Sequence, residues 1–401
     1  MPDVGGSYRR FDAVVVGAGP AGATAARGIA LLGWRVLLLE RESLPRYKPC
    51  GGGLGPKSVA RLPFPIHEVP NVRLARIDFR LRGESPVTWE LPDEFPFYMV
   101  MRADLDHHLV QAASAAGAEV HAPEGVRSVS WTGAEFLVAT GQAIYAAPYL
   151  VGADGASSIV RRSFGTDRTS EQGIALECEI EVPRNVYTRF ATTAIFDVEA
   201  APDGYGWIFP KTTHLSVGLG SLKPTNLPLR ALLRQFIERY ELASEDVLDE
   251  LAVHAHPLPV ASAGERARSG NALLAGDAAG VADGFGGEGI CYSMASGELA
   301  AETIARALEG DGSALEGYEA ALDRLIRQDH RQANLMGRIV RRFPDAGYRI
   351  LTSMGEGKTV LIPLLLGEIS FGEALRRLPR LLALDRMEAR GTDADILEDQ
   401  A

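Results

Sequence analysis

The sequence predicts an α/β protein of two lobes, one built on a parallel sheet and the other on an antiparallel sheet. Its 401 residues exceed the size at which one hydrophobic core usually keeps growing. A strand, helix and strand pattern opens the chain, and segments farther on alternate apolar and polar residues. A mostly helical, arginine-rich region begins near Tyr318.

The first elements form a βαβ unit. FDAVVV at 11–16 is short, β-branched and closed by glycine, which is typical of a buried parallel strand. The alanine-rich stretch 23–32 predicts a helix that Gly33 ends. WRVLLLE then predicts a second buried strand, which ends at Glu40.

The motif GAGPAG lies between the first strand and the helix, and this context indicates a Rossmann-type dinucleotide site. Gly17 permits the tight turn, Gly19 lets the backbone approach a pyrophosphate, and Gly22 lets the helix pack closely on the sheet. The helix N-terminus faces the phosphate charge, and Glu40 is placed to accept hydrogen bonds from an adenosine ribose. The alternative is a glycine-rich structural turn.

Later segments favour FAD over a nicotinamide cofactor, which shares the glycine motif. Arg102 precedes a predicted helix and is a candidate for the pyrophosphate. Asp154 follows a strand in GADG, and Asp277 follows another in NALLAGDAAG, where it is a candidate for the ribityl or pyrophosphate region. Each one alone is also compatible with a turn or a helix cap, so their order carries the prediction.

The glycine-rich segment GGEGI begins a predicted helix near Ile290. Unpaired N–H groups at Gly289 and Ile290 would bind the pyrimidine edge of a flavin and favour its reduced, anionic form. An ordinary glycine-rich helix start is the alternative.

Tyr205, Trp207 and Phe209 alternate, so on a strand they share one face. They would line either an apolar channel or a plain aromatic core. Cys50 lies in the glycine-rich run PRYKPCGGGLGP, where Gly51 and Gly53 would allow a ring to approach the backbone. A buried, inert thiol is the other interpretation of Cys50.

The predicted organisation is discontinuous. An FAD-binding domain takes residues 1–71, 101–173 and 263–317, and a substrate-binding sheet domain takes 72–100 and 174–262. A helical stretch is expected over 229–251, and residues 318–401 form the C-terminal helical region. These ranges follow the changes between helical and strand patterns.

On these motifs the chain resembles the geranylgeranyl reductase family, within the wider group of flavoproteins that includes the aromatic hydroxylases. KPCGGGL, GADGASS, YGWIFPK and GDAAGVADGFGGEGI carry the resemblance over about 11–308. It implies a Rossmann-type FAD-binding domain of the aromatic hydroxylase type. It places FAD contacts at Gly22, Glu40, Cys50, Gly51, Gly53, Arg102, Val126, Asp277, Gly289 and Ile290. One departure is Gly284, where relatives generally carry proline, so the shape of that loop is expected to differ.

The resemblance implies an FAD-dependent reductase that saturates carbon-carbon double bonds of a geranylgeranyl or related polyprenyl group. The substrate would be a prenylated lipid, a quinone or a prenyl diphosphate. Trp207 and Phe209 would contact the prenyl chain, and Cys50, Tyr205 or water would donate the proton. NADPH and ferredoxin both stay open as electron donors, because no separate nicotinamide fingerprint is present. The rival functions are an FAD-dependent monooxygenase or halogenase, and a noncatalytic flavin-binding protein.

The composition of the chain argues against several kinds of binding partner and site. A net charge of −11 argues against nucleic acid, and three cysteines without regular spacing indicate no disulfide framework or zinc site. His107 and His108 are expected on a solvated helix face, and neither they nor His254 and His256 are assigned to a metal. We expect a cytoplasmic protein, at most peripheral on the inner face of the membrane. VLIPLLL at 360–366, followed by Arg376, Arg377 and Arg380, indicates either a lipid-facing surface or packing on the body.

Overall fold

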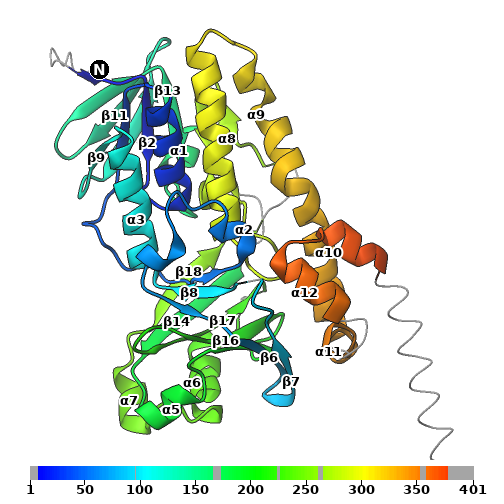
Figure 1. The fold of residues 1–401 in the computed structure, drawn as a ribbon. Helices are drawn as coiled ribbons and strands as arrows, with labels where there is room; N and C mark the ends of the chain where they lie inside the picture. Colours follow the sequence, from blue (N-terminus) through cyan, green and yellow to red (C-terminus); the bar gives the residue numbers. More distant parts are fainter. Residues whose placement is uncertain are drawn as a thin grey trace, which may run out of the picture.

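Two sheet-based lobes and a group of C-terminal helices make up the protein (Figure 1). The computed structural model describes residues 8–94, 96–165, 173–223, 226–260, 265–352 and 358–377. In Figure 1 the lobe with the parallel sheet lies above the lobe with the antiparallel sheet. The predicted α/β class is confirmed.

Strands from three separated stretches of the sequence form the parallel sheet. Its order is β19 (Arg268–Ser269), β20 (Ala272–Leu274), β13 (Tyr149–Gly152), β2 (Ala13–Val16), β3 (Val36–Leu39) and β9 (Glu119–His121). All neighbours are parallel except β19 and β20. The strands β2 and β3 are buried on both faces, which explains their unbroken runs of valine and leucine.

Helices α1 (Pro20–Leu31), α3 (Arg102–Ala115) and α8 (Ile290–Leu308) pack together beside this sheet. Two glycines make the close approach possible. A Cβ on Gly22 would overlap the carbonyl oxygen of Gly17, and a Cβ on Gly297 would overlap that of Ala21. The third glycine of the motif therefore serves the packing of α1.

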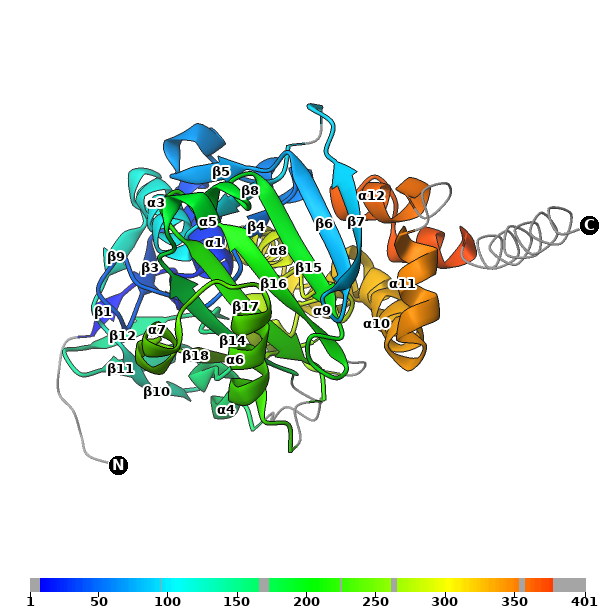
Figure 2. The same ribbon diagram turned by 90° about the horizontal axis from the view of Figure 1, so that it is seen from below.

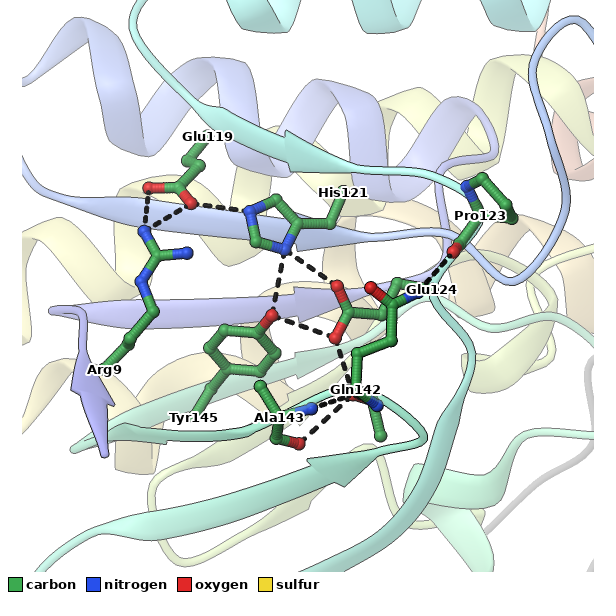
Figure 3. Close-up of polar contacts among 9 residues, drawn as sticks. Arg9, Glu119, His121, Pro123, Glu124, Gln142, Ala143 and Tyr145 are labelled. Atoms are coloured by element: carbon green, nitrogen blue, oxygen red, sulfur yellow. Dashed lines mark hydrogen bonds and ion pairs between the residues drawn. The ribbon is translucent and has the colours of Figure 1, made fainter. Parts of the chain in front are cut away.

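A smaller sheet of β1 (Arg9–Arg10), β12 (Ile144–Ala147), β11 (Phe136–Thr140) and β10 (Val126–Trp131) lies on this lobe, with α4 (Ile159–Ser163) against β10. Figure 3 shows the polar cluster that joins it to β9. His121 Nε2 lies 2.6 Å from Glu119 Oε1, and its Nδ1 lies 2.9 Å from both Glu124 Oε2 and the Tyr145 hydroxyl. The Glu124 N–H donates to the carbonyl of Glu40. The cluster thus fixes the ends of β9 and β3, where Glu40 lies.

The antiparallel lobe is a seven-stranded sheet with helices on one face. Its order is β18 (His254–Leu258), β14 (Gly173–Ile180), β17 (Leu215–Ser221), β16 (Gly204–Pro210), β15 (Thr193–Val198), β6 (Arg76–Leu81) and β7 (Glu84–Glu90). Only β15 and β6 are parallel neighbours. The outer face packs on α6 (Leu229–Arg239), next to α5 (Arg184–Thr188) and α7 (Glu245–Glu250) (Figure 2).

The structure adds detail to two expectations about this lobe. The helical stretch over 229–251 consists of two helices, because Glu241 has φ 56°, a left-handed conformation that ends α6. The segment 72–100 contributes to two sheets. While β6 and β7 join the seven-stranded sheet, β5 (Asn71–Arg73) and β8 (Tyr98–Val100) pair with β4 (Gly53–Leu54) of the glycine-rich segment. The short helices α2 (Pro56–Val59) and η1 (Ile66–Glu68) lie between β4 and β5.

The first C-terminal helix packs along α8, and the later ones lie beside β6 and β7 (Figure 1 and Figure 2). They are α9 (Ala314–Leu322), the π-helical turn η3 (Asp323–Arg327), α10 (Gln328–Arg342), α11 (Pro344–Thr352) and α12 (Lys358–Leu366). Val360, Ile362 and Leu364 are buried in one cluster with Phe79 and Trp89. The lipid-facing reading of VLIPLLL is therefore wrong, since the run packs on the body. Arg380 lies outside the described residues.

Within the described part of the chain, no helix combines the length and apolar character needed to cross a bilayer.

Acid should destabilise the packing of α10 through His330. Its ring is fully buried, 4.3 Å from the ring centre of Tyr292. Burial lowers the pKa of His330 from 6.5 to about 4, so the folded state favours the neutral ring. Its contribution to stability is complete above pH 6.5 and is lost as pH falls through 4. We expect a loss of about 3 kcal/mol in the free energy of unfolding over that range.

Denaturant unfolding at a series of pH values checks this prediction. His330→Leu should lose that part of the acid sensitivity, and His67→Leu, at an exposed histidine, should keep it. Equal acid sensitivity in the wild type and His330→Leu would contradict the assignment.

Candidate functional site

A cavity of about 960 Å³ lies between the parallel sheet and the seven-stranded sheet, within the size range of cofactor sites. It brings together almost all of the predicted site residues. Those that line it are Gly17, Gly19, Glu40, Cys50, Gly51, Gly53, Arg102, Val126, Asp154, Tyr205, Trp207, Phe209, Asp277, Gly289 and Ile290. Gly22 does not line it, because Gly22 lies in the contact between α1 and the sheet.

The glycine motif lines one end of the cavity, next to the start of α1. Gly17 has φ 96°, and a Cβ there would overlap the carbonyl of Ala153, so only glycine fits the turn. Gly19 is the N-cap residue, and no side chain of the described residues caps this helix end. The first N–H groups of α1 are therefore available to an anion.

Glu40 and two arginines form a buried charge network beside this turn. Glu40 Oε2 accepts from the Ala18 N–H at 2.9 Å and lies 3.3 Å from Arg46 Nε. Arg46 also reaches Asp106 at 3.1 Å, and Arg102 binds both oxygens of Asp106 at 2.8 and 2.9 Å. The sequence analysis missed Arg46, whose only signal is its place before KPCGGG.

A second cationic group surrounds Asp277, at the start of the short helix η2 (Gly276–Ala279). Lys48 Nζ lies 2.8 Å from His256 Nε2, and both approach Asp277 Oδ2, at 3.9 and 3.7 Å. Burial alone would raise the pKa of Asp277, but the hydrogen bond from His256 and the charge of Lys48 outweigh it and hold the pKa at about 2. Asp277 therefore stays ionised. Lys48 and His256 were not predicted as site residues.

The side chain of Asp154 caps the start of helix α4. Its Oδ2 accepts from the N–H groups of Ile159 and Val160 at 2.6 and 3.2 Å, at the start of α4. The carboxylate of Asp154 therefore caps a helix, which was the alternative interpretation from the sequence. The residue still borders the cavity.

The glycine-rich segment packs directly on the aromatic face of β16. A Cβ on Gly51 would lie 2.6 Å from Phe209 Cε2. The buried Lys211, which follows β16, donates from Nζ to the carbonyl of Gly51 at 2.6 Å and to that of Val100 at 2.8 Å. This lysine fixes the segment against the sheet. It ends the motif YGWIFPK, but the sequence analysis gave it no role.

The aromatic residues of β16 share one face, as predicted. The rings of Tyr205, Trp207 and Phe209 follow one another at 6.1 and 6.2 Å, and Phe196 lies 5.0 Å from Phe209. Trp207 and Phe209 are mostly buried and border the cavity. Opposite Trp207 is Gly218, where a Cβ would overlap the indole ring. Gly218 thus leaves room for the indole ring of Trp207 to lie against the sheet.

The loop that leads into α8 lies next to this aromatic face and also lines the cavity. Asp283 Oδ1 accepts from the N–H groups of Phe285 and Gly286 at 2.8 and 2.7 Å, and Tyr205 donates to the Gly286 carbonyl at 2.7 Å. Glu288 Oε1 accepts from the Cys291 N–H at 2.9 Å. Part of the helix end that was predicted to face a flavin is therefore capped by Glu288.

The loop around Gly284 is held from outside by α10. Arg341 Nη1 donates to the Gly284 carbonyl at 2.9 Å, and a Cβ on Gly284 would overlap the amide of Asn334. These contacts account for glycine at this position.

Two other histidines singled out in the sequence lie on α3. His107 and His108 are half-buried, contrary to the expected solvated face, because His108 packs against Phe64 and its Nδ1 lies 2.8 Å from the Asp104 carbonyl. In the described part of the chain, no group of three or more histidine, cysteine or acidic residues is arranged to hold a metal ion.

Comparison with known proteins decides the family. The family model for the FAD binding domain matches residues 10–332. Geranylgeranyl diphosphate reductase of Rhodobacter capsulatus is 33% identical over 312 residues, which cover 73% of this chain and 74% of the relative. The chain belongs to the geranylgeranyl reductase family.

This member of the geranylgeranyl reductase family is also similar to two further proteins, one in sequence and one in structure. Menaquinone reductase of Mycobacterium tuberculosis is 32% identical, over 73% of this chain and 76% of the relative. The crystal structure of a geranylgeranyl bacteriochlorophyll reductase-like protein from Thermoplasma acidophilum has a TM-score of 0.76 at 21% identity. It covers 94% of this chain and all of that one. The cofactor of the family, and of this protein, is FAD.

The residues present fit that cofactor. The start of α1 and the buried cations Arg46, Arg102 and Lys48 suit a negatively charged pyrophosphate. Glu40 is a buried acceptor at the end of β3, where an adenosine ribose binds in Rossmann folds. The roles of the individual residues are proposals, which binding measurements on variants can test.

Adding one methyl group at Gly51 should weaken FAD binding. Since the Cβ would lie 2.6 Å from Phe209, Gly51→Ala must displace either the ring or the segment that borders the cavity. We expect the affinity for FAD to fall at least tenfold, which corresponds to about 1.4 kcal/mol. Quenching of flavin fluorescence on titration into apoprotein measures it. Gly317→Ala, in open space on α9, is the matched control and should bind FAD normally. Unchanged affinity in Gly51→Ala would show that the segment does not limit the flavin site.

Proposed function

We propose that this protein is a reductase that saturates carbon-carbon double bonds of a geranylgeranyl or related polyprenyl group, carried on a lipid, a quinone or a diphosphate. The observation that carries the proposal is the aromatic face of β16 and β15, which borders the same cavity as the FAD-binding segments. Its relatives in bacteria are named geranylgeranyl diphosphate reductase and menaquinone reductase. An apolar isoprenoid chain fits the lining of Trp207, Phe209 and Phe196.

The chemistry places two demands on the chain's own residues. An isolated alkene has no carbonyl that an active site could polarise, so alignment and exclusion of water carry much of the catalysis. The buried faces of Trp207 and Phe209 meet the first demand by holding the chain in a dry channel. Bound FAD, once reduced, supplies hydride, so the protein must supply a proton. Cys50 and Tyr205 both border the cavity and are candidates, together with water.

The electron donor is proposed to be NADPH or ferredoxin. No described feature favours one over the other.

Anaerobic turnover tests the proposed reaction. Enzyme reduced with dithionite under strict exclusion of oxygen should add two hydrogens per double bond to geranylgeranyl diphosphate, as seen by mass spectrometry of the product. Trp207→Ala should lower kcat/KM roughly ten- to 100-fold, because it removes a side chain whose burial is worth about 1.5–3 kcal/mol. Trp131→Ala, at an exposed tryptophan of β10, is the matched control.

The rivals give different results in the same experiment. A monooxygenase or halogenase would form no product without oxygen. A noncatalytic flavin-binding protein would leave its reduced flavin unoxidised when the prenyl compound is added.

We propose further that the protein meets its substrate at the inner face of the cytoplasmic membrane, through one face of α10. Leu335, Ile339 and Phe343 are exposed at helical spacing, and Arg338 and Arg342 are exposed between them. Exposed apolar side chains flanked by arginines suit an anionic bilayer. The acidity of the whole chain opposes this attraction, but the arginines act locally.

Sedimentation with vesicles of phosphatidylcholine and phosphatidylglycerol measures this contact. Binding should fall as salt rises, and it should be lost when Leu335, Ile339 and Phe343 are all changed to serine. Changing the exposed Leu31 and Leu32 to serine should leave binding intact. Equal loss in both variants, or no binding by the wild type, would exclude α10 as the membrane contact.

A further inference from the structure

Two acidic residues point from β14 toward the cavity, although the strand is otherwise apolar. Leu176, Cys178 and Ile180 alternate with them and pack into the core on the opposite face of the sheet. Glu177 is 2% exposed and lines the cavity, and Glu179 follows on the same face. Burying a carboxyl group is costly unless it is paired or protonated, so this placement calls for a chemical reason.

Glu177 lies across a glycine from the tryptophan of the aromatic face. In the sheet register Glu177 is opposite Gly218, and Gly218 is opposite Trp207. Because a Cβ on Gly218 would overlap the indole, the ring of Trp207 lies over this glycine. The carboxyl group therefore borders the surface on which we place the prenyl chain.

Burial and the neighbouring Glu179 favour a protonated Glu177, and they outweigh the hydrogen bond from Ser216, which favours the ionised form. Ser216 Oγ donates to Glu177 Oε1 at 2.7 Å, and Trp207 Nε1 lies 3.4 Å from Ser216 Oγ. The second oxygen of Glu177 has no donor among the described residues, and the carboxyl of Glu179 is within hydrogen-bonding reach. Two carboxyl groups can share a hydrogen bond only when one of them is protonated. Burial, and then the negative charge of Glu179, raise the pKa of Glu177 to about 7.

A route for protons leads from Glu179 to the surface. Nε2 of His214 lies 3.0 Å from Glu179 Oε2, and Nδ1 of His214 lies 3.0 Å from Thr213 Oγ1. Thr213 is exposed in the turn between β16 and β17. His214, Glu179 and Glu177 thus form a continuous series of titratable groups between solvent and the cavity.

Other charged and titratable groups face Glu177 from the elements around it. Lys211 at the end of β16 favours its ionised form, but it is committed to two backbone carbonyls. Tyr47 approaches from the glycine-rich segment, and the exposed His254 is opposite Glu177 on β18. None of these outweighs burial and Glu179, so Glu177 is the best acid on this side of the cavity. By contrast, burial raises the pKa of Tyr205, and its hydroxyl already donates to a carbonyl.

We infer that Glu177 donates the proton that reduction of the alkene requires, and that Glu179 and His214 return a proton to it from solvent. The inference rests on the proposed reductase function. The π bond of the alkene breaks and two C–H bonds form. One takes a hydride, with both electrons, from the reduced flavin, and the other takes the proton of Glu177. The flavin is thereby oxidised, and Glu177 is left as a carboxylate until Glu179 passes on a proton that enters through His214.

Single-turnover oxidation of the reduced enzyme by geranylgeranyl diphosphate, measured anaerobically over a range of pH, tests the inference. The wild-type rate should fall as pH rises through about 7, where Glu177 loses its proton. Glu177→Gln should lower the rate 10²- to 10⁴-fold and abolish that pH dependence. Glu179→Gln removes the like charge that raises the pKa, so the fall should move to lower pH. Glu181→Gln, at the exposed acid after β14, should match the wild type.

A readout that needs no turnover separates a chemical role from a structural one. In the apoprotein, the infrared carbonyl band of a protonated carboxylic acid should titrate near pH 7, and Glu177→Gln should remove it. FAD affinity should be unchanged in Glu177→Gln, which shows that the variant is folded. If the wild type reduces alkenes and Glu177→Gln does so at the same rate, the inference is overturned and Cys50 or water becomes the donor. A wild type that reduces no alkene contradicts the proposed function instead, and the infrared titration still reports whether Glu177 is an acid near neutral pH.

Discussion

The buried ammonium group of Lys211 is the interaction on which the rest of the site depends. It joins the carbonyls of Gly51 and Val100, which belong to segments from the FAD-binding side, to the end of a strand in the opposite sheet. Burying a lysine costs free energy, and burial lowers the pKa of Lys211, but its two hydrogen bonds and the charges of Glu179 and Glu177 stabilise the ammonium group there. Because both carbonyls are held, the glycine-rich segment lies directly on Phe209, and the two lobes enclose one cavity instead of two separate surfaces.

The cavity is chemically divided along its length. Arg46, Arg102 and Lys48 are held among Glu40, Asp106 and Asp277 at the end near the glycine motif. At the other end the lining is largely aromatic, and the buried Glu177 of β14 is one of the acidic groups that border it. Such a division suits a substrate and cofactor pair in which one part is a charged dinucleotide and the other an apolar chain. The cations that stabilise negative charge all lie at the cofactor end. A different residue must therefore donate the proton at the apolar end.

Much of the FAD side could be predicted because its signals are local. GAGPAG between a strand and a helix requires glycine for reasons of backbone geometry, and the order of later Asp and Gly turns follows the parallel sheet. The shared face of Tyr205, Trp207 and Phe209 follows from the two-residue period of a strand. The capping role of Asp154 was open at the level of sequence, because a turn aspartate serves a ligand or a helix equally well.

The sequence by itself determined the α/β class, the glycine turn and the family, since these depend on periodicity and on residues close together in the chain. Only the tertiary structure decided that Lys48 meets His256, that Lys211 holds Gly51, and that Glu177 lies across a glycine from Trp207. Each of these pairs joins segments far apart in sequence. The partner of a charged residue in an apolar strand can be identified only when the sheet register and the contact between the lobes are known. The same reason explains why VLIPLLL, apolar enough for lipid, lies instead in a core with Phe79 and Trp89.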